Sequence, residues 1–101
     1  IPIQCDIYEP AAGTQWPAGT SLPVRYRVEN NVTGANAYMY LRDENTGQIW
    51  NVGTSPGSDG DHLKMAKIPL DCLPGSYRVG LLWLGDHTTR WESDSFEVIA
   101  P

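Results

Sequence analysis

The chain has 101 residues, of which 41% are hydrophobic and 19% are charged, a composition typical of a single globular domain. Twelve acidic residues against seven scattered basic ones give a formal net charge of -5, which argues against nucleic acid as a partner. No apolar run approaches the roughly 18 residues of a membrane span. We therefore expect one domain over residues 1–101 and no segment that crosses a bilayer.

Turn residues interrupt the chain at short intervals, and the segments between them alternate polar and apolar residues with period two, as strands do. The expected strands, in chain order, are Gln4–Glu9, Leu22–Glu29, Ala37–Arg42, Gln48–Val52, His62–Leu70, Tyr77–Leu84 and Trp91–Ile99. The segment Thr54–Asp61 carries Pro56, Gly57 and Gly60 and is expected to be the most mobile loop. No helix is expected.

The same alternation predicts which way side chains point. In the second expected strand, apolar residues share one face and arginines occupy the other. In the fifth, Leu63 and Met65 are expected to face inward and Lys64 outward, with a bulge near Ala66. The sixth strand, Tyr77–Leu84, is apolar on both faces, so we expect it to be central or to lie under a partner.

Seven strands over about 100 residues predict an immunoglobulin-like or fibronectin-III-like β-sandwich. Two turns support this fold class. Asp43–Gly47 is expected to form a hairpin turn in which Gly47 supplies a positive φ. Tyr77 follows a Pro-Gly turn at the position of a tyrosine corner, so its hydroxyl is expected to bond to the backbone near Leu73.

Cysteines and a sequon indicate the compartment. Cys5 and Cys72 form neither a C-x-x-C pair nor a metal-ligand spacing, and their even number predicts a disulfide, with two buried free thiols as the alternative. Closing a loop of about 67 residues, this bond would stabilise the fold by roughly 4 kcal/mol. Asn31, in the sequon Asn-Val-Thr of a polar connection, is the expected N-glycosylation site, with an unused sequon as the alternative. Together with a chain that begins at Ile1 rather than methionine, these features favour a processed, secreted protein.

Two runs of the sequence carry a family resemblance. The first is a proline, a Gly-Thr turn, a tryptophan, an Ala-Gly dipeptide and an alternating strand, here Pro10, Gly13, Thr14, Trp16, Ala18, Gly19 and Val24–Val28; the second is Leu73–Val79. This pattern resembles the N-terminal domain of fungal Ser/Thr-rich GPI-anchored and yeast cell-wall-synthesis proteins. The resemblance implies a secreted or wall-associated immunoglobulin-like domain without a defined active site. Because no Ser/Thr-rich stalk or hydrophobic anchor signal follows the domain, we expect a free-standing form rather than a GPI-anchored one.

Catalytic and metal chemistry find little support. His62 has Asp59 and Asp61 as neighbours and His87 has Asp86, but no motif supplies the third group that would activate a nucleophile. The acidic loop around Asp59 lacks the spacing and bidentate Glu of a Ca²⁺ site, and the His and Cys spacings match no zinc pattern. We therefore expect no catalytic residue, no metal and no cofactor, and hence no enzyme.

Aromatic residues are the candidate ligand-binding site, because aromatic rings stack on the apolar CH faces of sugars. The candidates are Trp50 in a short hairpin strand, Trp91 after a polar loop, and Tyr38 and Tyr40 on one strand face. The alternative for all four is ordinary packing inside the sandwich.

Leu82 and Leu84, on the second face of the sixth strand, are the candidate subunit interface, with a two-fold homodimer as the commonest outcome. Altogether we expect a secreted or wall-associated, non-catalytic fungal binding protein for extracellular glycans. The alternative is a soluble immunomodulatory or lectin-like effector that contacts proteins or receptors on other cells.

Overall fold

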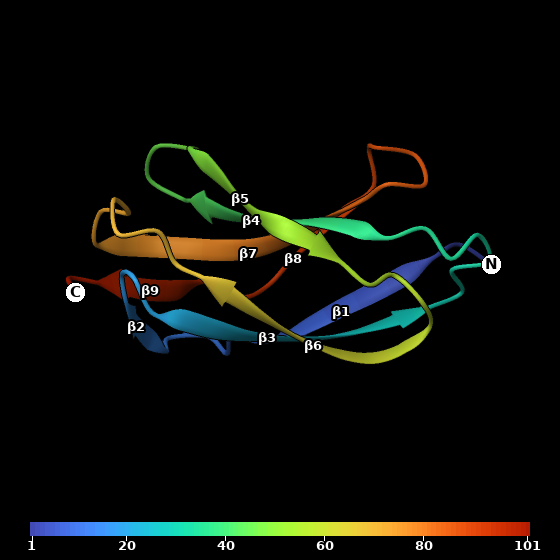
Figure 1. Ribbon diagram of the computed structural model, residues 1–101, viewed down its shortest axis with the longest axis horizontal. Coiled ribbons are helices and arrows are strands. Elements are labelled where there is room, and N and C mark those ends of the chain that lie inside the picture. The colour runs from blue at the N-terminus through green and yellow to red at the C-terminus, as the bar shows by residue number, and fades with distance from the viewer.

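The computed structural model of the chain describes residues 1–101 as two packed β-sheets without helices (Figure 1). The strands are β1 (Gln4–Glu9), β2 (Gln15–Pro17), β3 (Ser21–Glu29), β4 (Ala37–Asp43), β5 (Ile49–Ser55), β6 (Gly60–Lys67), β7 (Gly75–Trp83), β8 (Arg90–Glu92) and β9 (Phe96–Ile99). One sheet has the order β1-β3-β6, and the other has the order β2-β9-β7-β4-β5 with β8 paired to β7. This arrangement confirms the predicted all-β sandwich. No helix of a length and apolarity suited to crossing a membrane is present.

The core lies between the two sheets and follows the predicted alternation of β3 and β7. The inward residues of β3 are at most 4% exposed, and those of β7 from Tyr77 to Leu81 are at most 1% exposed. Burying each large apolar side chain contributes on the order of 1.5–3 kcal/mol. Apolar residues at every second position therefore hold the two sheets together.

Both predicted turns are confirmed. The Tyr77 hydroxyl donates a hydrogen bond to the Leu73 carbonyl at 2.7 Å, which closes the tyrosine corner. Gly47 has a φ of 78°, and its N–H donates to the Asp43 carbonyl at 2.8 Å. A side chain at this φ would be strained, so glycine suits the hairpin.

The predicted orientation of the fifth strand is wrong. Leu63 and Met65 are 52% and 53% exposed, on the outer face of β6. The reason is register: β6 pairs with β3 without interruption, so His62 lies opposite Tyr26 in the direction of the core. Directly opposed residues share a face of the sheet, which sends the intervening residues outward. The predicted bulge near Ala66 is likewise absent.

The number and the bounds of the strands also differ from the prediction, most clearly at three places. The short strand β2 lies in the turn-rich segment and pairs parallel with β9. The last expected strand is divided into β8 and β9, because the Ser93 hydroxyl, rather than a backbone carbonyl, accepts the Val79 N–H at 3.0 Å. Strand β5 runs to Ser55, into the segment expected to be a mobile loop.

Candidate functional site

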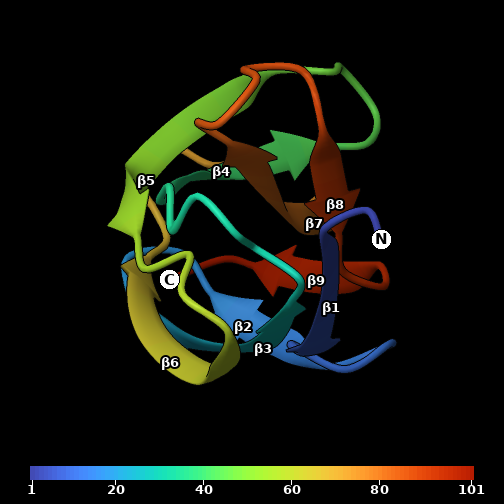
Figure 2. The ribbon, with the colours of Figure 1, turned by 90° about the vertical axis from the view of Figure 1, so that its right-hand side faces the viewer.

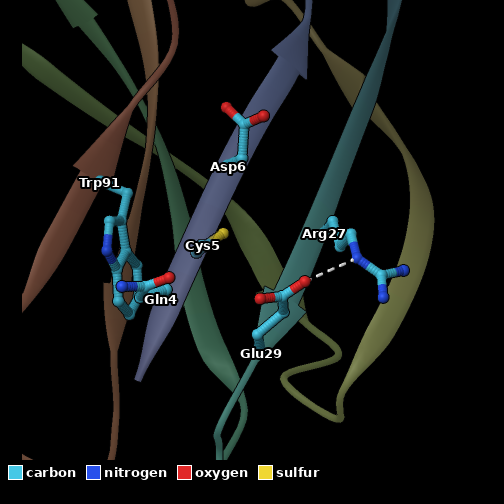
Figure 3. Close-up of a pocket in the computed structure, with 6 residues that line it drawn as sticks. All are labelled: Gln4, Cys5, Asp6, Arg27, Glu29 and Trp91. Carbon is cyan, nitrogen blue, oxygen red and sulfur yellow. Dashed lines mark hydrogen bonds and ion pairs between the residues drawn. The ribbon is translucent and has the colours of Figure 1, made fainter. Parts of the chain in front are cut away.

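An open groove crosses the outer face of β1 and β3 and reaches the neighbouring strand β8. It has a volume of about 450 Å³, and we call it the Trp91 groove; Figure 3 shows its lining residues, which are Gln4, Cys5, Asp6, Arg27, Glu29 and Trp91. The register places its polar residues on one face, because Gln4 pairs with Glu29 and Asp6 with Arg27. These residues face away from the core.

Trp91 reaches the groove because β8 lies beside β1 (Figure 2). Cross-strand pairing with Leu81 directs the Trp91 side chain towards the space between the sheets. There the indole packs against the core, remains partly exposed and also lines the groove. The core holds the ring in place while part of it stays open to a ligand.

Ion pairs form the opposite side of the groove. Arg27 Nε lies 3.0 Å from Glu29 Oε1, and another of its nitrogens lies 3.3 Å from Asp61 Oδ2. The hydrogen bond to Glu29 and the two carboxylate charges raise the pKa of Arg27, so the guanidinium stays cationic. All three side chains are at least half exposed, and exposed ion pairs contribute little to folding. They remain available to bond to a ligand.

Two of the other aromatic candidates, Tyr40 and Trp50, contact other side chains of the domain. Tyr40 is 3% exposed, its hydroxyl donates to Glu92 at 2.8 Å, and the Arg90 guanidinium lies over its ring. Burial and the bond to Glu92 raise the pKa of Tyr40 to about 12. Trp50 packs against the core, with its ring centroid 5.9 Å from that of Tyr77. Neither ring lines a groove.

Of the remaining candidates, Tyr38 and Leu82 lie on the outer face of the larger sheet, and Leu84 follows the end of β7. Tyr38 pairs with Leu82 across β4 and β7, and Arg90 pairs with Leu82 from the other side. Tyr38, Leu82 and Leu84 are all partly buried. The two leucines therefore do not make the fully uncovered apolar patch that the sequence left open.

The predicted disulfide is wrong, because Cys5 and Cys72 are free thiols. Cys5 lies near the start of β1 and Cys72 in the connection between β6 and β7, and Figure 1 shows these two segments towards opposite ends of the long axis. Cys5 pairs with Val28, which in turn pairs with Gly60 at the start of β6. Cys72 follows the end of β6, and that strand spans roughly 23 Å at about 3.3 Å per residue. A disulfide needs Cα atoms within about 7 Å.

The side chain that the sequence suggested as a glycan acceptor is largely buried. Asn31 is only 8% exposed, and its Nδ2 donates to the carbonyls of Ala35 at 2.9 Å and Gly57 at 2.5 Å. A glycan would replace one of the two hydrogens on this nitrogen. The side chain thus ties together the β3–β4 and β5–β6 connections, and it is not the accessible acceptor that the sequence suggested.

The His62 side chain makes contacts within the fold, whereas the His87 side chain makes no hydrogen bond. His62 stacks on Tyr26, with ring centroids 5.1 Å apart, and its Nε2 lies 2.7 Å from the Ser58 carbonyl. The Asp86 carboxylate beside His87 accepts bonds from Thr88 and Thr89 instead. No group of three or more His, Cys, Asp or Glu side chains comes together as a metal site would require.

A second groove lies at the other end of β1, and we call it the Trp16 groove. It has a volume of about 270 Å³ and is lined by Glu9, Pro10, Ala11, Thr14, Trp16 and Pro23. The indole N–H of Trp16 donates to Thr14 Oγ1 at 3.0 Å, which fixes the ring. Sequence reasoning used Trp16 only as part of a turn motif and did not single out the outward polar residues of β1 and β3. Alternation in these two predicted strands is the signal that could have found them.

Comparison with known proteins bears on the fold alone. No protein-family model and no curated protein matches the sequence. Among solved structures, the chain is similar to the fibronectin(III)-like modules of Clostridium thermocellum CbhA, with a TM-score of 0.51 and 14% sequence identity. The match covers 97% of this chain and 47% of that chain, so this chain spans about half the length of the solved one. The architecture is therefore that of a fibronectin-III-like sandwich.

Proposed function

We propose that this domain is a non-catalytic module that binds extracellular glycans through the Trp91 groove. One observation carries the proposal: the groove combines a rigidly held, partly exposed indole with carboxylate, amide and guanidinium groups. The apolar CH face of a sugar ring stacks on the indole, and its hydroxyls bond to the polar groups. Trp91 is the only one of the four predicted aromatic candidates that lines this groove.

The charged groups that line the groove indicate which charge the ligand carries. Asp6 and Glu29 face the ligand space together with Arg27, and the whole chain carries a net charge of -5. A polyanionic glycan would meet repulsion from these carboxylates, whereas the hydroxyls of a neutral glycan can bond to both signs of charge. The proposed ligand is therefore neutral.

The proposed setting is the extracellular space or the cell wall. It is supported by the turn and strand motifs around Trp16 and Tyr77, which resemble those of fungal wall-associated domains. It does not depend on a disulfide or on a glycan at Asn31.

The test is a glycan array followed by calorimetry with a hit, comparing wild type with Trp91→Ala and Trp50→Phe. Trp91→Ala should abolish measurable binding, because it removes the stacking surface. Trp50→Phe alters an indole outside the groove and should leave affinity unchanged. Thermal unfolding confirms that each variant is folded. A folded wild type that binds no glycan on the array would refute the proposal.

A second candidate function is contact with another protein. It is favoured by Leu63 and Met65, which lie exposed on the outer face of β6. Exposed apolar residues in a cluster are typical of protein interfaces. Leu63→Asp should weaken binding to a protein partner while leaving any glycan binding intact, and the same change separates the two functions.

A further inference from the structure

We infer that the binding surface extends along β1 and β3 from the Trp91 groove to the Trp16 groove, and that its ligand is a linear, neutral oligosaccharide longer than a disaccharide. This inference rests on the proposed function. It adds the length and the shape of the ligand.

The two grooves occupy the same face of the same two strands. Residues at every second position of β3 point outward, and these include Arg27 and Glu29 in the first groove and Pro23 in the second. On β1, Asp6 lines the first groove and Glu9 the second. No other strand lies between them, because β1 and β3 are direct neighbours.

The residues between the grooves suit a sugar chain. Tyr8 lies there on β1 and is 44% exposed, beside a register shift between Ile7 and Glu9. Arg25 pairs with Glu9 across the strands, with 3.1 Å between Nε and Oε2, and both side chains are nearly half exposed. An aromatic ring and an ion pair thus continue the combination found in the Trp91 groove.

The separation of the grooves sets the ligand length. Along β3, Glu29 lies six residue steps from Pro23, which is about 20 Å at about 3.4 Å per residue. A single terminal sugar or a disaccharide is too short to extend from Glu29 in the Trp91 groove to Pro23 in the Trp16 groove. A chain of several linked sugars can stack on Trp91, pass over Tyr8 and stack on Trp16, and each contact adds to the same binding event.

Each indole is fixed by its own contacts within the domain. Trp16 packs against the core and bonds to Thr14, and Trp91 packs against the core from β8. Binding therefore orders few side chains, which lowers the entropic cost of capturing a flexible chain.

The experiment compares a disaccharide with a hexasaccharide in titrations followed by two-dimensional NMR. The probes are a disaccharide and a hexasaccharide of β-1,3-linked glucose, and a disaccharide and a hexasaccharide derived from chitin. A heparin hexasaccharide is the anionic control. The hexasaccharide should bind at least about tenfold more tightly than the disaccharide and shift both the Trp16 and Trp91 indole N–H signals. The heparin probe should shift neither.

Three variants complete the test. Trp16→Ala and Tyr8→Ala should each weaken hexasaccharide binding several-fold and leave disaccharide binding in the Trp91 groove unchanged. Tyr8 is exposed, so its variant keeps the test decisive if Trp16→Ala unfolds. Ile49→Ala, at an exposed residue of β5 in the other sheet, is the control and should have no effect.

The outcomes distinguish failure of the extended surface from failure of glycan binding itself. If sugars bind through Trp91 but the hexasaccharide gains nothing over the disaccharide, or if both Trp16→Ala and Tyr8→Ala bind it normally, the extended surface is overturned and the proposed function stands. If no probe of either length shifts any signal, the proposed function fails and the extension fails with it.

Discussion

Replacing Asn31 by alanine should destabilise the fold strongly, because it removes the donor of two hydrogen bonds. The carbonyls of Ala35 and Gly57 would lose their bonds at 2.9 and 2.5 Å in a region where the Asn31 side chain is buried. An unsatisfied buried acceptor costs about 1–3 kcal/mol, and because the bond to Ala35 is only partly buried, the loss of both should cost about 2–4 kcal/mol. For a domain of this size, that corresponds to a fall in Tm on the order of 10–20 °C.

Thr33→Ala provides the matched control. It destroys the same sequon, yet it removes only the exposed hydroxyl's bonds, at 3.1 Å to Asn31 Oδ1 and 3.3 Å from the Ala35 N–H. Its cost should stay below about 1 kcal/mol. Any contribution from a glycan is lost equally in both variants and therefore cancels. Urea denaturation of the two proteins measures the difference, and equal stabilities would refute the structural role of the Asn31 amide.

Other single contacts give sharp expectations. Gly80→Ala should lower the free energy of unfolding by about 1–3 kcal/mol in urea denaturation, because the added Cβ would lie 2.0 Å from Cζ of Tyr40. The double variant with Tyr40→Ala should lose less stability than the sum of the two single variants. Strict additivity would contradict the clash. Arg42 donates two hydrogen bonds to the Glu92 carboxylate and thereby lowers the pKa of Glu92. The stability that this pair adds is present above the unfolded pKa of about 4.3 and is lost as the pH falls through the folded pKa. Glu92→Gln should flatten the acid side of the stability curve, and an unchanged acid side would count against this ion pair. Burial raises the pKa of Cys5 to about 12 and that of Cys72 to about 11, so an aromatic disulfide reagent should react slowly with the native protein and find two thiols after unfolding. Finding none after unfolding would restore the disulfide.

The sequence predicted the sandwich because β3 and β7 keep their apolar residues on the face that the structure buries. In β6 the same reasoning failed. Leu63 and Met65 alternate with His62 and Lys64, and hydropathy alone favours the leucine and the methionine for the core. Pairing with β3 decides otherwise, and register is set by residues far away in the chain.

The candidate site was predictable only in part, for a related reason. Trp91 was identified as an exposed aromatic candidate, and it does line a groove. Trp50 and Tyr40 were candidates as well, but Trp50 packs against Tyr77 and the Arg90 guanidinium lies over Tyr40, and neither ring lines a groove. Tyr77 and Arg90 lie far from these two residues in the chain. Exposure of a ring on a strand depends on what the neighbouring strands place over it, and no local pattern reports that.

The path of the chain after β1 affects how the protein behaves at high concentration. β1 shifts register between Ile7 and Glu9, and the chain then moves to the other sheet, where β2 is only three residues long. A long, regular border strand presents unpaired N–H and C=O groups that can recruit strands from other molecules. Here that border is divided into two short pieces that belong to different sheets. Stacking of copies strand against strand is therefore disfavoured on this side, which helps the domain to resist aggregation.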